Sequence, residues 1–180
     1  MPDLNLENKK TRIEILEIAR FWLQKGVFGF RLDAAKHIYP AWEPSEKNII
    51  FWEALRKELE KDFGYVYLVG EVWSTPDKLA PYYRGLTASF NFELCYDIRD
   101  VLLRERDYKN VVEKLQRTYK AYAQVNSNFI DATFLGNHDQ ERIASVFKNN
   151  KRKLKAAINL LMTLPGNPYI YYGEELGTEG

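Results

Sequence analysis

The chain is 180 residues long, with 46% hydrophobic and 28% charged residues, which excludes the composition of disordered or fibrous proteins. The formal net charge is +1, so the chain as a whole has no electrostatic attraction for nucleic acid. A single cysteine, Cys95, excludes an internal disulfide, and no apolar run approaches the roughly 20 residues that a membrane helix needs. We therefore predict neither a nucleic-acid nor a membrane partner.

The first part of the sequence predicts helices and strands in alternation. Apolar residues at helical spacing indicate a helix over 9–25, and a strand is expected directly after it over 27–32. Ser45 can cap a second helix that ends at Gly64, and the nearly continuous apolar run 65–70 predicts a strand that is covered on both faces. A strand after each helix is the pattern of a parallel sheet.

The rest of the sequence continues this alternation. We expect, in chain order, a loop with two prolines at 76–81, a short strand near 88–93 and a helical stretch from about 97. A longer helix at 107–123 should pack one face on the core, with Tyr108, Val111, Val112, Leu115, Tyr119 and Tyr122 on that face. A strand at 132–136, two helical segments up to Pro165 and a final strand at 168–172 follow. The pattern predicts an α/β fold with about five parallel strands, and a single domain over 1–180 because no stretch resembles a linker.

A carboxylate follows three of the predicted strands, namely Asp33, Glu71 and Asp139. A carboxylate at the end of a buried strand is costly unless it is hydrogen-bonded or used in chemistry. In a parallel barrel the C-terminal ends of the strands converge on one face, where the active site lies. The three carboxylates are therefore predicted to form a catalytic site.

Each carboxylate taken alone also has a simpler structural explanation. Asp33 could cap a following helix, Glu71 could be a salt-bridge partner, and Asp139 could be a turn residue. For an isolated residue these explanations are favoured. The ordered set, with Arg31 and His138 alongside, favours catalysis.

The segments around these residues resemble, in order, motifs of the α-amylase family of retaining glycoside hydrolases. They are GFRLDAAKH at 29–37, GEVW at 70–73 and FLGNHD at 134–139, with MPDLN at 1–5 before them and PGNPYIYYGEELG at 165–177 after them. The resemblance implies a (β/α)8 TIM barrel, which typically needs about 250 residues when complete. We therefore expect an incomplete barrel that lacks the first three strands and any C-terminal β-domain, with two edge strands through which a homo-oligomer could form.

The resemblance also implies roles for individual residues. Asp33 corresponds to the nucleophile and Glu71 to the acid/base of a retaining hydrolysis, in which the two carboxyl groups lie about 5–5.5 Å apart. Asp139 corresponds to the aspartate that grips the sugar hydroxyls and favours the distorted ring of the transition state. Sugar contacts are implied for His138 and for the pair Lys36 and His37, although Lys36 could equally be a solvated surface lysine.

The neighbours of the two predicted catalytic groups suggest how each is kept in its working form. Arg31 lies two residues before Asp33, hence on the same face of the strand, and can hold this carboxylate ionised. Glu71 lies among Val69, Val72 and Trp73, where partial desolvation is expected to hold it protonated.

Aromatic side chains that follow strand ends are candidates for the walls of sugar subsites, with ordinary packing as an equally good explanation. They are Trp42, Trp73, Tyr82 and Tyr83. Arg142, one helical turn past Asp139, could brace its motif or pair with a nearby acid, and no role is assigned to it.

The resemblance implies a retaining glycoside hydrolase that acts on α-1,4-glucans or maltooligosaccharides, with the isolated chain expected to be inactive. The alternatives are a transglycosylase or a cyclomaltodextrinase-like or neopullulanase-like enzyme of the same family, and a non-catalytic carbohydrate-binding or partner-interaction scaffold. Family members often bind calcium with the main chain at the His37 position as one ligand. Most of the other ligands would lie outside this sequence, so we predict no bound metal or other cofactor.

Overall fold

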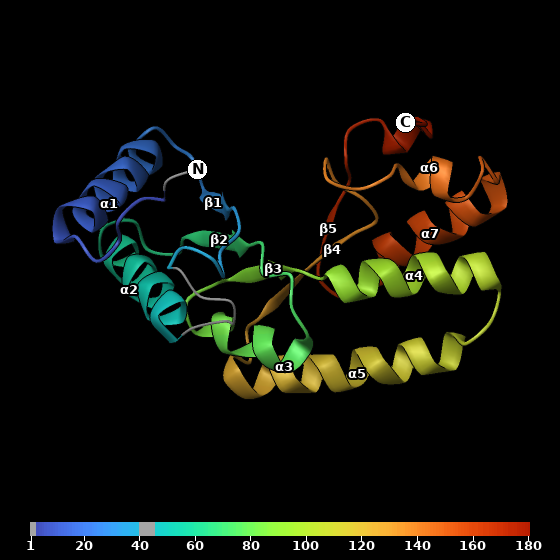
Figure 1. Cartoon of the computed structure of the whole chain (residues 1–180), viewed down its shortest axis with the longest axis horizontal. Coiled ribbons are helices and arrows are strands. Elements are labelled where there is room, and N and C mark those ends of the chain that lie inside the picture. Colours follow the sequence, from blue (N-terminus) through green and yellow to red (C-terminus); the bar gives the residue numbers. More distant parts are fainter. Residues whose placement is uncertain (1–2, 40–45) are drawn as a thin grey trace. The chain divides into compact units, whose positions relative to one another are not determined.

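The computed structural model describes residues 3–39 and 46–180, in which helices and strands alternate along the chain (Figure 1). Contacts between residues divide the chain into two compact units. Unit 1 comprises Met1–Ser89 and Ala121–Phe129, and unit 2 comprises Phe90–Lys120 and Ile130–Gly180. The single domain expected from the sequence stays a prediction.

Unit 1 is built on parallel strands with helices between them. Its elements are α1 (Lys9–Gln24), β1 (Gly29–Leu32), α2 (Glu46–Phe63), β2 (Tyr67–Gly70), α3 (Pro76–Leu79), the 3-10 helix η1 (Ala80–Arg84) and β3 (Ala88–Phe90), whose last residue belongs to unit 2. β1 pairs with β2 in parallel, with Gly29 opposite Tyr67, and β2 pairs with β3 in parallel, with Val69 opposite Ala88.

Local sequence explains why β1 and β2 form at these positions. A Cβ added to Gly29 would lie 1.9 Å from the main-chain oxygen of Tyr67, so β1 can approach β2 this closely only because glycine stands there. In β2 and the residue before it, Val66, Leu68 and Val69 are all buried, which confirms the prediction of a strand covered on both faces.

Unit 2 contains the remaining elements and its own core. They are α4 (Phe92–Arg104), α5 (Tyr108–Val125), which continues into unit 1 from Ala121, β4 (Ile130–Phe134), α6 (Ile143–Val146), α7 (Lys151–Thr163), β5 (Asn167–Tyr169) and the 3-10 helix η2 (Glu174–Leu176). β4 and β5 are parallel, with Phe134 opposite Tyr169. The core lies between α4, α6 and α7 and includes Ile98, Ile143 and Leu161.

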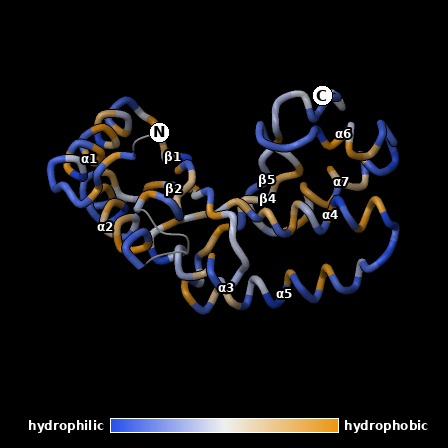
Figure 2. Tube along the Cα trace, in the orientation of Figure 1, coloured by the Kyte–Doolittle hydropathy of each residue, from blue (hydrophilic) through white to orange (hydrophobic). Residues whose placement is uncertain are grey.

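The five strands follow one another in chain order, β1-β2-β3-β4-β5, which confirms the predicted α/β fold with about five parallel strands. Apolar and polar residues alternate along the helices, as Figure 2 shows for α5 and α7. No helix in the described part of the chain is long and apolar enough to cross a membrane.

Three details of the predicted elements are wrong. The expected loop at 76–81 is helical, because Pro76 stands in the first turn of α3, where proline is favoured. The helix expected from about 97 begins at Phe92, because the side chain of Asn91 caps it by accepting a hydrogen bond from Leu94 N at 2.9 Å. On α5, Tyr108 and Val112 are exposed instead of buried.

Candidate active site

Arg31 joins the two carboxylates predicted to be the catalytic pair. Its Nη1 donates to Asp33 Oδ1 at 2.8 Å and its Nη2 donates to Glu71 Oε2 at 2.7 Å. The side chain of Asp33 is 76% exposed, whereas that of Glu71 is 16% exposed. One planar guanidinium therefore holds a solvent-facing carboxylate and a recessed carboxylate next to each other at the ends of β1 and β2.

Main-chain hydrogen bonds attach the turn that contains Asp33 to the end of β2. Glu71 N donates to Leu32 O at 2.9 Å, and Ala35 N donates to Glu71 O at 3.0 Å. Ala34, which lies in this turn, has φ of 42°, a left-handed conformation that is unfavourable for a residue with a Cβ. Backbone strain of this kind tends to cluster at active sites, where the surrounding structure enforces it. The chain forms a turn over residues 33–36 and a bend at 38–39, so Asp33 is not the cap of a directly following helix.

The surroundings of Glu71 differ from those expected. Val69 and Val72 are buried in the core, and Trp73 is exposed. The carboxylate of Glu71 lies against Arg31, and Ala34 N is 3.4 Å from its Oε2. Its immediate partners are therefore a cation and a main-chain donor, where the sequence suggested apolar side chains.

A hollow of about 410 Å³ opens beside this pair of carboxylates. Its lining residues are Ala34, Lys36, His37, Glu71 and Trp73. Lys36 is half-buried and its Nζ donates to the main-chain oxygen of Trp73, so it forms part of the wall and is not a freely solvated lysine. His37 is exposed at the same hollow. The structure thus brings together the five site residues predicted near the ends of β1 and β2, namely Arg31, Asp33, Lys36, His37 and Glu71.

Two residues of α2 that the sequence analysis did not single out support the loop after β1. Asn48 is fully buried, donates to Lys36 O through Nδ2 and accepts from Tyr39 N at 2.9 Å. Trp52 Nε1 donates to Ala35 O at 2.8 Å. A polar asparagine on the apolar face of a predicted helix was the available signal, because a buried amide requires hydrogen-bond partners.

His138 and Asp139 lie together in unit 2, in the turn that follows β4. His138 Nε2 is 3.2 Å from Asp139 Oδ2, and both side chains are largely exposed. Asn137 Oδ1 accepts from Asp139 N at 2.9 Å, which is the local bond of an Asx turn. Asp139 is therefore a turn residue, and its carboxylate faces solvent where it could receive a ligand.

The remaining predictions concern the aromatic subsite walls, the helix cap at Ser45 and metal binding. Tyr82 and Tyr83 of η1 are buried, so their prediction as subsite walls is wrong and the packing explanation holds. Trp42 and Ser45 lie outside the described residues. Among the described residues, no group of three or more His, Cys, Asp or Glu side chains could hold a metal ion.

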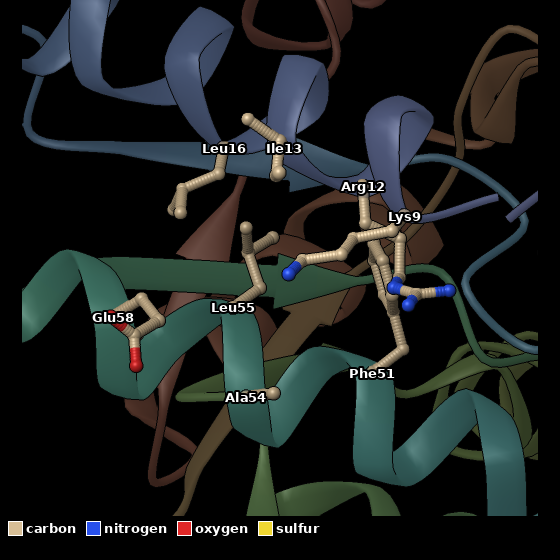
Figure 3. Close-up of a pocket in the computed structure, with 8 residues that line it drawn as sticks. All are labelled: Lys9, Arg12, Ile13, Leu16, Phe51, Ala54, Leu55 and Glu58. Atoms are coloured by element: carbon tan, nitrogen blue, oxygen red, sulfur yellow. The ribbon is translucent and has the colours of Figure 1, made fainter. Parts of the chain in front are cut away.

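A separate hollow of about 240 Å³ lies between α1 and α2 (Figure 3). Its lining is mostly apolar and includes Ile13 and Leu16 of α1 and Phe51 and Leu55 of α2, whose side chains lie between the two helices. This hollow is a gap in helix packing and not part of the site at the strand ends.

A buried carboxylate, Asp131, lies three residues before the FLGNHD segment. Asp131 of β4 is 2% exposed, and its Oδ2 accepts from Asn91 Nδ2 at 2.9 Å and lies 2.8 Å from the hydroxyl of Tyr119. Burial raises the pKa of Asp131 to about 6, against the opposing effect of these two donors. It is a buried titratable group of β4, eight residues before Asp139 in the sequence.

Comparison with known proteins identifies the family. The family model of the alpha amylase catalytic domain matches residues 1–180. Alpha-amylase 3 of Dictyoglomus thermophilum is 46% identical over 180 residues, covering 100% of this chain and 35% of that protein. A 4-alpha-glucanotransferase of Thermotoga maritima is 31% identical over 180 residues, covering 99% of this chain and 38% of that protein.

Solved structures agree. The crystal structure of alpha-amylase from H. orenii matches with a TM-score of 0.90 and 41% identity, covering 100% of this chain and 37% of that one. Eubacterium rectale Amy13B matches with a TM-score of 0.90 and 31% identity, covering 100% of this chain and 36% of that one. The chain thus spans little more than a third of these relatives, and its strands correspond to part of a (β/α)8 barrel. The chain belongs to the alpha-amylase catalytic-domain family.

Proposed function

We propose that this chain carries the catalytic pair of a retaining glycoside hydrolase that acts on α-1,4-glucans or maltooligosaccharides. The observation that carries the proposal is the bridge from Arg31 to both Asp33 and Glu71 at neighbouring strand ends. Retention requires two carboxyl groups close enough to act on the two sides of one glycosidic bond. A single guanidinium bound to both supplies that proximity.

The exposed Asp33 is suited to attack on the anomeric carbon. Its carboxylate oxygen forms an ester with the sugar while Glu71, acting as acid, gives its proton to the leaving glycosidic oxygen. Glu71 then acts as base, takes a proton from water, and the resulting hydroxide displaces Asp33 from the sugar. Both carboxyl groups thereby return to their starting protonation states, the glycosidic bond is replaced by a bond to the water oxygen, and the sugar keeps its α configuration.

Arg31 gives this sequence of steps an electrostatic rationale. Before attack the negative charge of the working pair is on Asp33, and after ester formation it is on Glu71. Because Arg31 donates to both side chains, the charge stays beside the same cation when it moves from one carboxyl group to the other. A fixed cation that needs no rearrangement between the two states is the kind of preorganised group that lowers a barrier.

We assign the remaining predicted residues to sugar binding. Lys36 and His37 line the hollow beside Glu71 and can donate to sugar hydroxyls there. His138 and Asp139 form a donor and acceptor pair of the type that binds vicinal hydroxyls. The names of the relatives support α-glucan substrates, since they include alpha-amylases and a 4-alpha-glucanotransferase.

The glucanotransferase relative favours transglycosylation as the second candidate. Both reactions share the ester on Asp33, and they differ in whether water or a sugar hydroxyl displaces it. Hydrolysis yields shorter products only, whereas transfer also yields products longer than the substrate.

We further propose that a second copy of the chain covers its strand edges. β1 and β5 stand at the two ends of the strand order among the described residues, and Phe28 and Ile170 beside them are exposed. Unpaired edges favour association. Sedimentation velocity should show a dimer or larger species, and a monodisperse monomer would contradict this part of the proposal.

Because the chain spans about a third of its relatives, activity is best tested in a chimera. Residues 1–180 would replace the matching segment of the Dictyoglomus thermophilum relative. The chimera should release products from maltoheptaose whose anomeric configuration, followed by proton NMR, is initially α. Asp33→Asn should abolish this release. Products of β configuration would overturn the retaining mechanism, and products longer than the substrate would support transfer.

A further inference from the structure

Among the described residues, no carboxylate forms an ion pair with Arg142. This arginine lies three residues past Asp139 and immediately before α6. Its guanidinium carbon is 4.3 Å from the ring centre of Tyr171 and 4.4 Å from that of Tyr172, and its Nη1 donates to Tyr172 O. A planar cation between two rings and a carbonyl has its position and its orientation fixed.

The two tyrosines belong to a short segment after β5, Tyr171–Glu174, which we call the anchor segment. The rings of Tyr171 and Tyr172 are 4.7 Å apart with 72° between their planes, so they meet edge to face. Glu174 is only 4% exposed, and its Oε2 accepts from Tyr171 N at 3.0 Å. The anchor segment is thus held internally as well as through Arg142.

The anchor segment also meets the other end of the loop that carries Asp139. A Cβ added to Gly136 would lie 3.0 Å from Glu174 Oε1, so this glycine lets the loop pass directly over the buried carboxylate. The loop from Gly136 to Arg142 therefore rests on the anchor segment at both of its ends. Between these ends, Gln140 Nε2 donates to Tyr96 OH at 2.9 Å.

The carboxylate of Asp139 itself has little direct support. Among the described residues, the one side chain within ion-pair distance of it is the imidazole of His138, and the Asp139 side chain is largely exposed. Its place consequently depends on the course of the loop backbone. A small displacement of the loop would move the carboxylate with it.

We propose that Arg142 is a positioning residue for His138 and Asp139, acting by locking the end of their loop to the rings of Tyr171 and Tyr172. The inference rests on the proposed function only for what Asp139 does. The lock requires the extended guanidinium, because a lysine ammonium in its place keeps the charge but is too compact to contact both rings and the carbonyl of Tyr172 together.

The test uses NMR of the 180-residue chain, in which His37 and His138 are the only histidines. In Arg142→Lys, the Hε1 signal of His138 should shift or broaden, while that of His37 stays in place. Tyr172→Leu, which removes an exposed ring and leaves Arg142, should change the His138 signal in the same direction. The matched control is Arg104→Lys, since Arg104 is an exposed arginine of unit 2 that pairs with Asp100.

These signals do not depend on activity, so they test the inference even if the chain is no glycosidase. A His138 signal that changes no more in Arg142→Lys and Tyr172→Leu than in the control would overturn the inference. In the chimera, Arg142→Lys should lower kcat by up to about a hundredfold with a smaller change in KM, because a misplacement of about 1 Å has such an effect. An unchanged kcat in an active chimera would also overturn it.

Discussion

The loops after β1 and β4 each carry an aspartate and have an arginine nearby, but the two arginines work differently. Arg31 touches Asp33 directly, and it touches Glu71 as well. Arg142 does not pair with Asp139 and holds the loop through Tyr171 and Tyr172. The first arginine contributes its charge, whereas the second contributes the span of its guanidinium, which reaches both rings. An arginine near a carboxylate can therefore act in two different ways, and substitutions at Arg31 and Arg142 should distinguish them.

The largest effect is expected for Arg31→Met in the chimera. It leaves Asp33 and Glu71 without their shared cation, and kcat/KM should fall by about 10²–10³-fold, the range found for removal of one preorganised donor. Arg31→Lys should recover part of this loss because it keeps the charge, although it cannot donate to both carboxylates in the same geometry. Steady-state kinetics on maltoheptaose measure both.

The contrast with Arg142 makes this prediction sharper. If charge matters at Arg31 and shape at Arg142, lysine should rescue the first position better than the second. Equal behaviour of the two lysine variants would break the comparison.

The second prediction compares two kinds of carboxylate. Those of the candidate site in unit 1 are paired with a cation, whereas the buried Asp131 of unit 2 accepts hydrogen bonds from neutral donors only. Its pKa is raised to about 6 from an ordinary value of 3.8. Between these values the folded state keeps a proton that the unfolded state releases, so the free energy of unfolding falls as pH rises through this window. The loss amounts to up to about 3 kcal/mol.

Asp131→Asn removes this titration, so its free energy of unfolding should fall less than that of the wild type between about pH 4 and pH 7. Urea unfolding across that range measures it. Asp100→Asn is the matched control, because Asp100 is an exposed carboxylate of the same unit paired with Arg104. If Asp131→Asn keeps the wild-type dependence on pH, burial does not raise the pKa of Asp131.

A smaller effect is expected at the support of the loop after β1. Trp52→Phe keeps the packing of an aromatic ring and removes the donor to Ala35 O. A buried carbonyl left without its partner should destabilise unit 1 by about 1–3 kcal/mol. Trp22→Phe is the control, since the Trp22 side chain is half-exposed on α1. Urea unfolding that fails to distinguish the two variants would show that the indole bond contributes nothing.

The smallest effect is expected at Ala34, the strained residue of the same loop. Ala34→Gly removes the Cβ that disfavours its left-handed conformation and should raise the free energy of unfolding by about 1 kcal/mol. Ala156→Gly on α7 should have the opposite sign, because glycine is unfavourable inside a helix. A loss of stability in Ala34→Gly would mean that this turn is not strained.

The sequence was sufficient to predict what depends on periodicity and on local chemistry. The apolar run 65–70 identified β2, because a covered strand has few polar residues, and it placed Glu71 directly after the end of that strand. The beginning of α4 was missed because the cap provided by Asn91 is a single side-chain contact within a segment that also suits a strand.

Contacts between distant residues could not be predicted in this way. Arg31 was expected to pair with Asp33, two residues away, but its bond to Glu71 joins residues 40 apart in sequence and depends on the register of β1 and β2. The burial of Tyr82 and Tyr83 depends likewise on neighbours that only the fold supplies.

The most direct test of the account is covalent labelling of the chimera with a 5-fluoro-α-glucosyl fluoride, followed by intact-mass and peptide mapping. The account predicts one fluoroglucosyl group on Asp33, formed more slowly in Arg31→Met and absent in Asp33→Asn. A label on another residue, or no label under conditions in which the unaltered relative is labelled, would contradict the assignment of Asp33 and Glu71 as a catalytic pair joined by Arg31.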